Sequence, residues 1–342
     1  MSLAVFRLLA RTLTRRLTRI GRTPAFRVAL LVLALVVWGA LAVPAPDVLP
    51  GDTLAAAGGG MPWPWWVLVL ALFALTSALG VLAVLAGIGG GVLFVPIVSG
   101  LMPFMHVDFV RGAGIMVALT GALSAGPKLL RESLADLRLS IPVALAASVG
   151  SFFGAELGLS IPASTVQLSL GLVILATAAL MVFVRPREHV AVTRPDRLST
   201  WLGISGTYQE KGQDTPLHWR PRRMLLGLLL FGAIGFMAGI FGLGAGWANV
   251  PVLNLVMALP LRLSVATSYF VLAIAGPTAA LVYAMRGAML PLVVVPSVLG
   301  IMLGARLGTL LLVRVRTELL RRIVIGVLLV AGLRALLRGF GI

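Results

Sequence analysis

The sequence predicts an all-α polytopic membrane protein with two inverted-topology helical repeats and one additional N-terminal transmembrane helix. Three observations lead to this fold class. Hydrophobic residues make up 59% of the 342 residues and charged residues only 11%, with a mean hydropathy of +1.05, which excludes an ordinary soluble domain. A glycine-rich motif occurs twice, between long apolar runs. Basic residues gather in a few segments that separate those runs, as in multi-pass chains.

Three N-terminal segments precede the repeats. Residues 1–26 place arginines on one helical face and leucines on another, which predicts a basic amphipathic cytoplasmic arm that binds anionic inner-leaflet lipids. An organellar transit peptide has a similar composition. Residues 27–43 predict the extra transmembrane helix. Residues 44–65 contain acidic residues but no Lys or Arg, so we expect an extracytoplasmic loop.

Five apolar helices are predicted in each repeat. Repeat 1 covers residues 66–184, with helices at Trp66–Ala86, Gly91–Met105, Arg111–Ala125, Leu139–Leu159 and Thr165–Val184. Repeat 2 covers residues 224–342, with helices at Met224–Phe241, Gly246–Leu259, Ser264–Met285, Ala288–Val313 and Ile323–Leu337. The second helix of each repeat is short for a full crossing, so the number of complete spans stays open. Between the repeats, the charged and proline-containing segment 185–223 predicts a cytoplasmic linker.

The charge distribution predicts the orientation of the chain. Basic residues gather in the arm, at 128–138, in the linker and at 314–322, and we place these segments in the cytoplasm. Repeat 1 then begins outside and repeat 2 begins inside, so the two repeats are inverted. This arrangement predicts a cytoplasmic N-terminus and a location in the plasma (inner) membrane.

The duplicated glycine motifs are the first candidate for a substrate site. Glycine allows close backbone approach and positive φ, and a helix that starts after such a cluster directs free N–H groups and a favourable dipole at an anion. Interrupted helices at corresponding places in two repeats are typical of transporter binding sites. The same glycines could instead only allow close helix packing. The candidate residues are Gly87, Gly89, Gly90, Gly91 and Pro96 in the first motif, and Gly242, Gly244, Gly246 and Pro251 in the second.

Polar side chains extend this candidate site. Asn249, Thr267 and Ser268 offer neutral donors at the depth where an oxyanion would rest, although such residues often bond their own helix. Arg111 is a charged candidate that could instead pair with Asp108 at the outer boundary.

A charge pair is predicted within the bundle. Glu156 and Arg306 occupy the same place in the related motifs Gly154–Gly158 and Gly304–Gly308. Because isolated charges are costly in a membrane, we expect the two side chains to form an ion pair. Alternatively, both could reach the interface along their own stems.

Enzymatic, metal and nucleic-acid functions are not expected. The chain has no cysteine and only three scattered histidines, which leaves little from which to build a metal site, and we expect no cofactor. No nucleophile and base can be paired along the sequence. The basic segments alternate with membrane helices and form no aromatic-basic surface, so we expect no nucleic-acid partner.

The motifs resemble those of the sulfite exporter TauE/SafE family of membrane permeases. The resemblance covers roughly residues 67–337 and is carried by Gly87–Pro96, Gly242–Pro251, Ala266–Ser268, Tyr283–Gly287 and Gly304–Gly308. It implies transport of small organosulfur or related anions across the plasma membrane. The first half departs from the pattern, since Arg111 to Ala113 stands where the second half has Ala266 to Ser268, and an arginine there could alter anion preference.

We therefore expect a secondary transporter that exports a small anion, such as sulfite, an organosulfonate or a small carboxylate, by alternating access at the repeat interface. Its partners are the anionic substrate and the lipid bilayer, and the sequence leaves a homodimer open. An anion channel and a non-transporting membrane scaffold are the alternatives. Counterflow in liposomes distinguishes a transporter from a channel, and a scaffold shows no solute flux.

Overall fold

The computed structural model describes most of the membrane part of the chain. The described residues are 65–86, 90–102, 105–131, 136–183, 196–201, 203–208, 217–311 and 317–339. The predicted arm, the extra N-terminal helix and nearly all of the following loop lie outside them. Within the described residues the chain is almost entirely helical, as the composition predicts.

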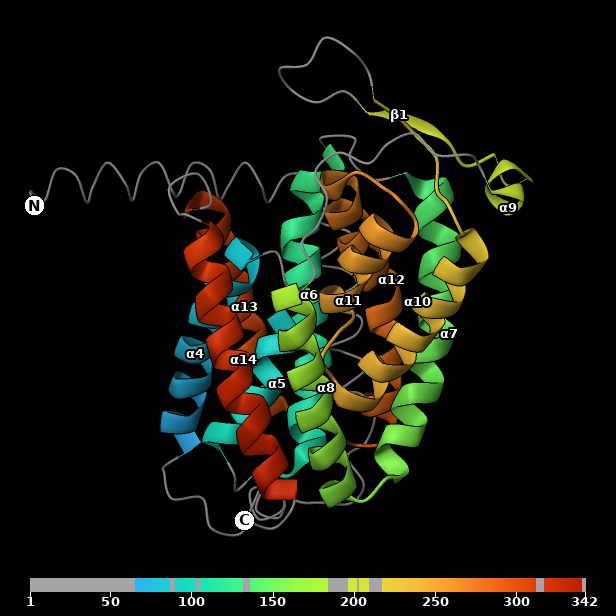
Figure 1. Cartoon of the computed structure of the whole chain (residues 1–342). Coiled ribbons are helices and arrows are strands. Elements are labelled where there is room, and N and C mark those ends of the chain that lie inside the picture. Colours follow the sequence, from blue (N-terminus) through green and yellow to red (C-terminus); the bar gives the residue numbers. More distant parts are fainter. Residues whose placement is uncertain are drawn as a thin grey trace, which may run out of the picture.

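The helices follow the predicted order (Figure 1). The first half contains α4 (Trp65–Ala86), α5 (Gly90–Leu101), α6 (Val107–Arg131), α7 (Leu137–Ser160) and α8 (Ala163–Phe183). The second half contains α10 (Met224–Phe241), α11 (Gly246–Pro251) with its π-helical continuation η1 (Val252–Val256), α12 (Leu261–Met285), α13 (Pro291–Leu311) and α14 (Thr317–Gly339). Every helix predicted in the two repeats is therefore confirmed, with ends that differ from the predicted ones by up to six residues.

Seven of the described helices are long and apolar enough to cross a bilayer. They are α4, α6, α7, α8, α10, α12 and α13. The apolar segment Gly90–Leu101 is shorter, and α11 has only 6 residues before the chain becomes π-helical. The shortness predicted for the second helix of each repeat is confirmed.

The segment between the halves contains structure that the sequence did not predict. It holds the short helix α9 (Arg197–Trp201) and the strands β1 (Gly206–Tyr208) and β2 (Leu217–Trp219), which pair antiparallel. The backbone N–H of Met224 donates to the Asp196 carboxylate at 2.9 Å. A carboxylate is favourable at the start of α10 because the first N–H groups of a helix lack internal partners.

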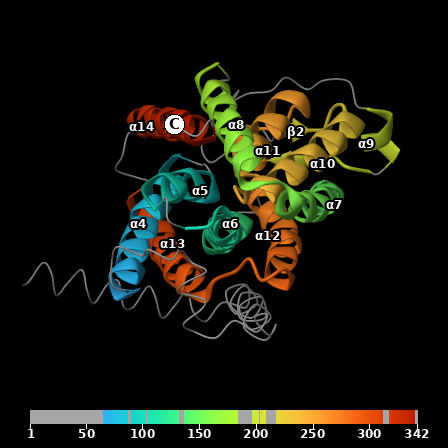
Figure 2. The same cartoon turned by 90° about the horizontal axis from the view of Figure 1, so that it is seen from below.

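Helix pairing exchanges partners between the two halves. The most extensive contacts join α7 to α10 and α13 to α4, and both pairs are visible in Figure 2. Small residues form these seams: a Cβ at Gly154 would overlap the carbonyl oxygen of Phe236, and a Cβ at Gly304 would overlap that of Ser77. Each half thus packs its fourth helix on the first helix of the other half, through the close backbone approach typical of membrane helices.

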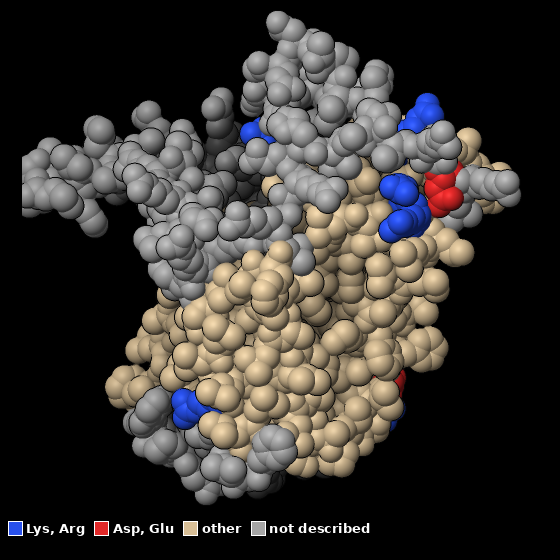
Figure 3. All heavy atoms as spheres, viewed as in Figure 1, with Lys and Arg blue, Asp and Glu red and all other residues tan. Residues whose placement is uncertain are grey.

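Helix α6 occupies the centre of the bundle. Figure 2 shows it among α5, α13, α12 and α7, and it packs most extensively on α12, α13 and α5. Of the residues in its apolar stretch Val107–Ser124, 72% are buried, the largest share among the seven candidate spans. Large apolar side chains such as Val149, Phe153 and Leu229 are exposed on the outer helices. Charged residues of the described part lie toward the two ends of the bundle in Figure 3, as a surrounding lipid phase requires.

Candidate functional site

The two glycine motifs meet in the middle of the bundle. A Cβ added at Gly91 would lie 2.6 Å from the carbonyl oxygen of Leu243, in the other motif. The same atom would lie 2.8 Å from the Cβ of Ala118 on α6, and a Cβ at Gly244 would lie 2.6 Å from that methyl group. Both motifs therefore pack against one turn of the central helix, where only glycine fits.

The second motif shows how the chain is interrupted. Gly242 has φ +67° and Gly244 has φ +70°, which are left-handed conformations that favour glycine. The N–H of Gly242 donates to the carbonyl oxygen of Ala238 at 3.0 Å and closes α10. Gly246 then begins α11, and Pro251 ends it where the π-helix starts. Single π-helical turns within helices often mark functional positions.

The first motif is described from Gly90 onward. Gly87 and Gly89 lie outside the described residues. Gly90 begins α5, and a Cβ there would lie 2.7 Å from Cδ1 of Ile301 on α13. Pro96 is buried inside α5. This glycine motif therefore packs tightly as well, which is the second interpretation that the sequence left open.

Buried polar atoms lie on α11, which is part of the second motif, and on α12. Asn249 on α11 and Thr267 on α12 are fully buried, and within the described part of the chain neither amide atom of Asn249 nor the Thr267 hydroxyl has a hydrogen-bond partner. Trp247 Nε1 is a further buried donor without a hydrogen-bond partner in the described part of the chain. Ser268 is buried too. Helices α11 and α12 pack against each other. Each buried group left without a partner costs about 1–3 kcal/mol, so these atoms are candidates for bonding to a ligand or to water.

A second buried asparagine behaves differently. Asn254, in η1, donates its side-chain amide to the carbonyl oxygen of Leu259 at 2.8 Å. It therefore has a structural role in closing the turn before α12. Asn254 is thus bonded within the protein, whereas Asn249, within the second glycine motif, has no partner in the described part of the chain.

The Arg111 guanidinium joins several helices. Its Nη1 donates to the carbonyl oxygens of Gly158 at 3.0 Å and Ile240 at 2.8 Å, and its Nη2 pairs with the Asp108 carboxylate. The guanidinium carbon lies 6.0 Å from the ring centroid of Tyr283, within the range of a cation–π contact. Arg111 is thus held by α6, α7, α10 and α12. A cation is favourable at the C-terminal ends of α7 and α10 because their last carbonyls carry partial negative charge.

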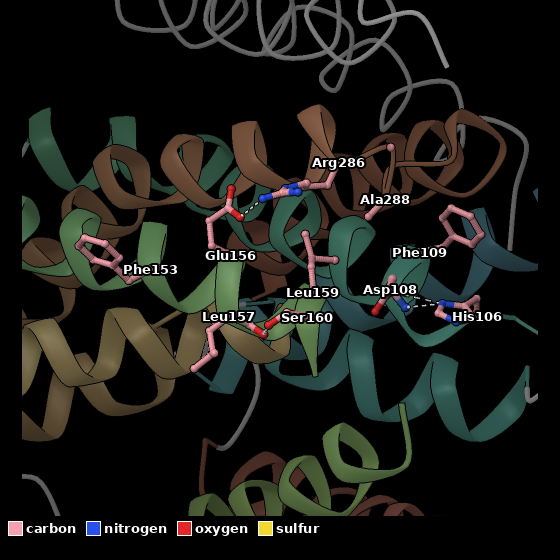
Figure 4. A pocket seen from close by; sticks show the side chains of 11 residues that line it. His106, Asp108, Phe109, Phe153, Glu156, Leu157, Leu159, Ser160, Arg286 and Ala288 are labelled. Atoms are coloured by element: carbon pink, nitrogen blue, oxygen red, sulfur yellow. Dashed lines mark hydrogen bonds and ion pairs between the residues drawn. The ribbon is translucent and has the colours of Figure 1, made fainter. Parts of the chain in front are cut away.

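A cleft of about 900 Å³ opens beside Asp108, the ion-pair partner of Arg111, and we call it the mouth cleft (Figure 4). It lies where α6 begins and α7 and α12 end, at the end of the bundle away from the β1–β2 ribbon. Its polar lining residues are His106, Asp108, Glu156, Ser160 and Arg286. His106 Nδ1 lies 3.5 Å from Asp108 Oδ2, and Arg286 Nη2 donates to Glu156 Oε2 at 2.5 Å.

The structure gives Glu156 a different partner from the predicted one. Its carboxylate pairs with Arg286 at the end of α12, whereas Arg306 lies on α13. The two equivalent motifs belong to separate helix pairs, with Gly154 packed on α10 and Gly304 packed on α4. The motifs Gly154–Gly158 and Gly304–Gly308 therefore pack on different helices. Sequence reasoning missed Arg286. A signal was present, because a glycine such as Gly287 often ends a helix, and a charge beside a helix end can reach water. In the structure Gly287 does have a left-handed φ of +68°.

Comparisons with known proteins identify a family for the chain. A family model described as "Sulfite exporter TauE/SafE" matches residues 71–335, which include both glycine motifs. A "Probable membrane transporter protein YunE" from Bacillus subtilis (strain 168) is 23% identical over 267 residues, covering 76% of this chain and 94% of that protein. No solved structure matches the chain.

Proposed function

The chain belongs to the sulfite exporter TauE/SafE family, and from this premise we propose that it exports a small anion across the plasma membrane by alternating access. Membership in a membrane-transporter family and the seven candidate spans support a multi-pass transporter. The substrate class in the proposal is sulfite, an organosulfonate or a small carboxylate. The outward direction and the sulfur-containing candidates follow the family description.

One observation carries the proposed substrate site. Asn249, within the second glycine motif, and Thr267 on α12 present buried hydrogen-bonding atoms that have no partner in the described part of the chain. An amide and a hydroxyl are suitable donors for the oxygens of a small oxyanion. Neutral donors also bind an anion without a fixed counter-charge, so the anion can leave again during transport. The first N–H groups of α5, after Gly90, lack internal helix partners and favour negative charge.

The helix exchange supports the inverted repeat and its motion. The α7–α10 and α13–α4 pairs correspond to each other in the two halves, and each has a tightly packed glycine seam. Such pairs are suited to moving as rigid bodies. In the proposed cycle they rock about the glycine motifs, so that the site is exposed to one side of the membrane at a time. The close contact between Gly91 and Leu243 argues against a permanently open channel.

The two buried asparagines provide the test. We expect Asn249→Leu to abolish sulfite and acetate flux in proteoliposomes while thermal stability is retained or raised, because an unsatisfied buried group is replaced by an apolar one. The matched control is Asn254→Leu, which should lower stability through the lost bond to Leu259. Its folded fraction should still transport.

Three outcomes would contradict parts of the proposal. Normal flux in Asn249→Leu means that the substrate does not use this site. Flux without trans-stimulation by counter-substrate identifies a channel. Absence of flux in the wild-type protein for sulfite, sulfonates and small carboxylates leaves a scaffold role instead.

A further inference from the structure

The ion pair in the mouth cleft joins two helices that belong to different halves of the chain. Glu156 lies near the end of α7 and Arg286 directly follows α12. Figure 4 shows the two side chains reaching toward each other across the cleft wall, with Ser160, Asp108 and His106 on the other side. A group that separates Glu156 from Arg286 therefore also acts on the contact between these helix ends.

The charges of the cleft differ in how firmly they are held. Asp108 is neutralised by the buried Arg111, whose guanidinium also bonds two backbone carbonyls. Of the described residues that line the cleft, Arg286 is the one with a permanent positive charge, and 60% of its side chain is exposed. Glu156, with 35% exposed, is its only recorded ion-pair partner in the described part of the chain. Arg286 is thus the accessible cationic group of the cleft.

We propose that Arg286 binds the exported anion at the mouth cleft, and that Glu156 occupies this arginine when the anion is absent; the proposal rests on the function proposed above. A guanidinium offers paired N–H donors that match a carboxylate, and it matches sulfite or a sulfonate in the same way. Glu156 is therefore an internal substitute for the substrate. An anion that reaches the cleft replaces one carboxylate with another oxyanion on the same donors.

The exposure of the pair makes this exchange feasible. Exposed ion pairs contribute little to stability because water and salt screen them and their side chains lose freedom. The pair between Glu156 and Arg286 is open to the cleft, so a competing oxyanion meets little resistance. Released from Arg286, Glu156 no longer ties α7 to the end of α12. Binding of the anion at the mouth thereby removes one contact between these helix ends.

The experiment uses substitutions with opposite expected effects. In proteoliposomes, Glu156→Gln should lower the apparent KM for sulfite at the mouth-cleft side by about two- to fivefold, since the competing carboxylate is removed. Arg286→Gln should raise it by about tenfold or more, because charge-assisted bonds to the anion are lost. The double variant should behave as Arg286→Gln does. Arg222→Gln is the control, because Arg222 is exposed and lies away from the cleft lining.

A binding measurement on the purified full-length protein keeps the two proposals distinguishable. The sulfite concentration needed to raise the thermal unfolding midpoint should change in the same opposite directions, with sodium chloride as the ionic-strength control. Equal or parallel changes in Glu156→Gln and Arg286→Gln would show a purely structural pair and overturn the mouth site, even if the protein transports. Opposite changes in binding without any flux would support the site and refute the transport function.

Discussion

Replacing Gly91 by alanine tests the meeting of the two glycine motifs most directly. The added methyl group would lie 2.6 Å from the Leu243 carbonyl oxygen and 2.8 Å from the Gly114 carbonyl oxygen. Ordinary contact begins at 3.4 Å, so the methyl is 3.4 − 2.6 = 0.8 Å too close to one oxygen and 3.4 − 2.8 = 0.6 Å too close to the other. Both are backbone atoms of different segments, so neither can rotate away.

The expected magnitude follows from this overlap. Overpacking a closely packed interior costs about 1–3 kcal/mol. Alanine is favoured over glycine in a helix by roughly 0.5–1 kcal/mol, which offsets part of that cost. Gly100→Ala lies on the same helix, and among the described residues its methyl would meet only Cδ of Arg334 at 3.8 Å. Because the helix preference applies to both variants, the difference between them isolates the overpacking term of about 1–3 kcal/mol.

Thermal unfolding of the purified protein measures this difference. Gly91→Ala should unfold below Gly100→Ala by roughly 1–4 °C, because an unfolding entropy of about 2.1 cal/mol/K per residue corresponds to about 1.4 °C per kcal/mol for a chain of 342 residues. Gly100→Ala should match or exceed the wild type. Equal midpoints for the two variants would refute the close approach of Gly91 to Leu243.

Two further predictions concern the contacts of Arg111 and the topology. Arg111→Gln should reduce stability by about 3–5 kcal/mol in a thermal unfolding assay, because Asp108 loses its partner and two carbonyls lose a donor. Adding Asp108→Asn should restore part of the loss, and strictly additive losses would show that the two residues are independent. In this cysteine-free chain, cysteines at Ser160 and Thr317 should react with membrane-impermeant reagents from opposite sides, outside and cytoplasmic respectively, and labelling from one side would contradict the inverted repeat.

Helix positions could be predicted from the sequence because lipid imposes a simple rule. Backbone polar groups must be satisfied within each crossing segment, so apolar runs of sufficient length become helices. The predicted bounds of α4, α7 and α10 differ from the structure by no more than two residues at either end. The β1–β2 ribbon was not predicted, since strands of three residues are too short for an alternating pattern to emerge.

Side-chain partners were harder to predict than helices. Repetition in the sequence identified Glu156 as an important position but suggested Arg306, because equivalence between repeats gives no distance. The actual partner, Arg286, has no counterpart in that motif and is placed by the pairing of α7 with α12. Arg111 was correctly weighed against Asp108, since a spacing of three residues on a helix brings two side chains together. Its bonds to Gly158 and Ile240 depend on tertiary structure alone.

The exchange of helices between the halves also constrains how such a chain arose. A single copy of the repeat would hold a helix like α7 with its glycine seam, yet the helix that covers this seam belongs to the other half. Under the proposed inversion, an ancestral single repeat could complete its packing only by associating with a second copy inserted in the opposite orientation. Gene duplication and fusion would then have placed two oppositely oriented copies in one chain, and the segment 185–223 would be the linker between them.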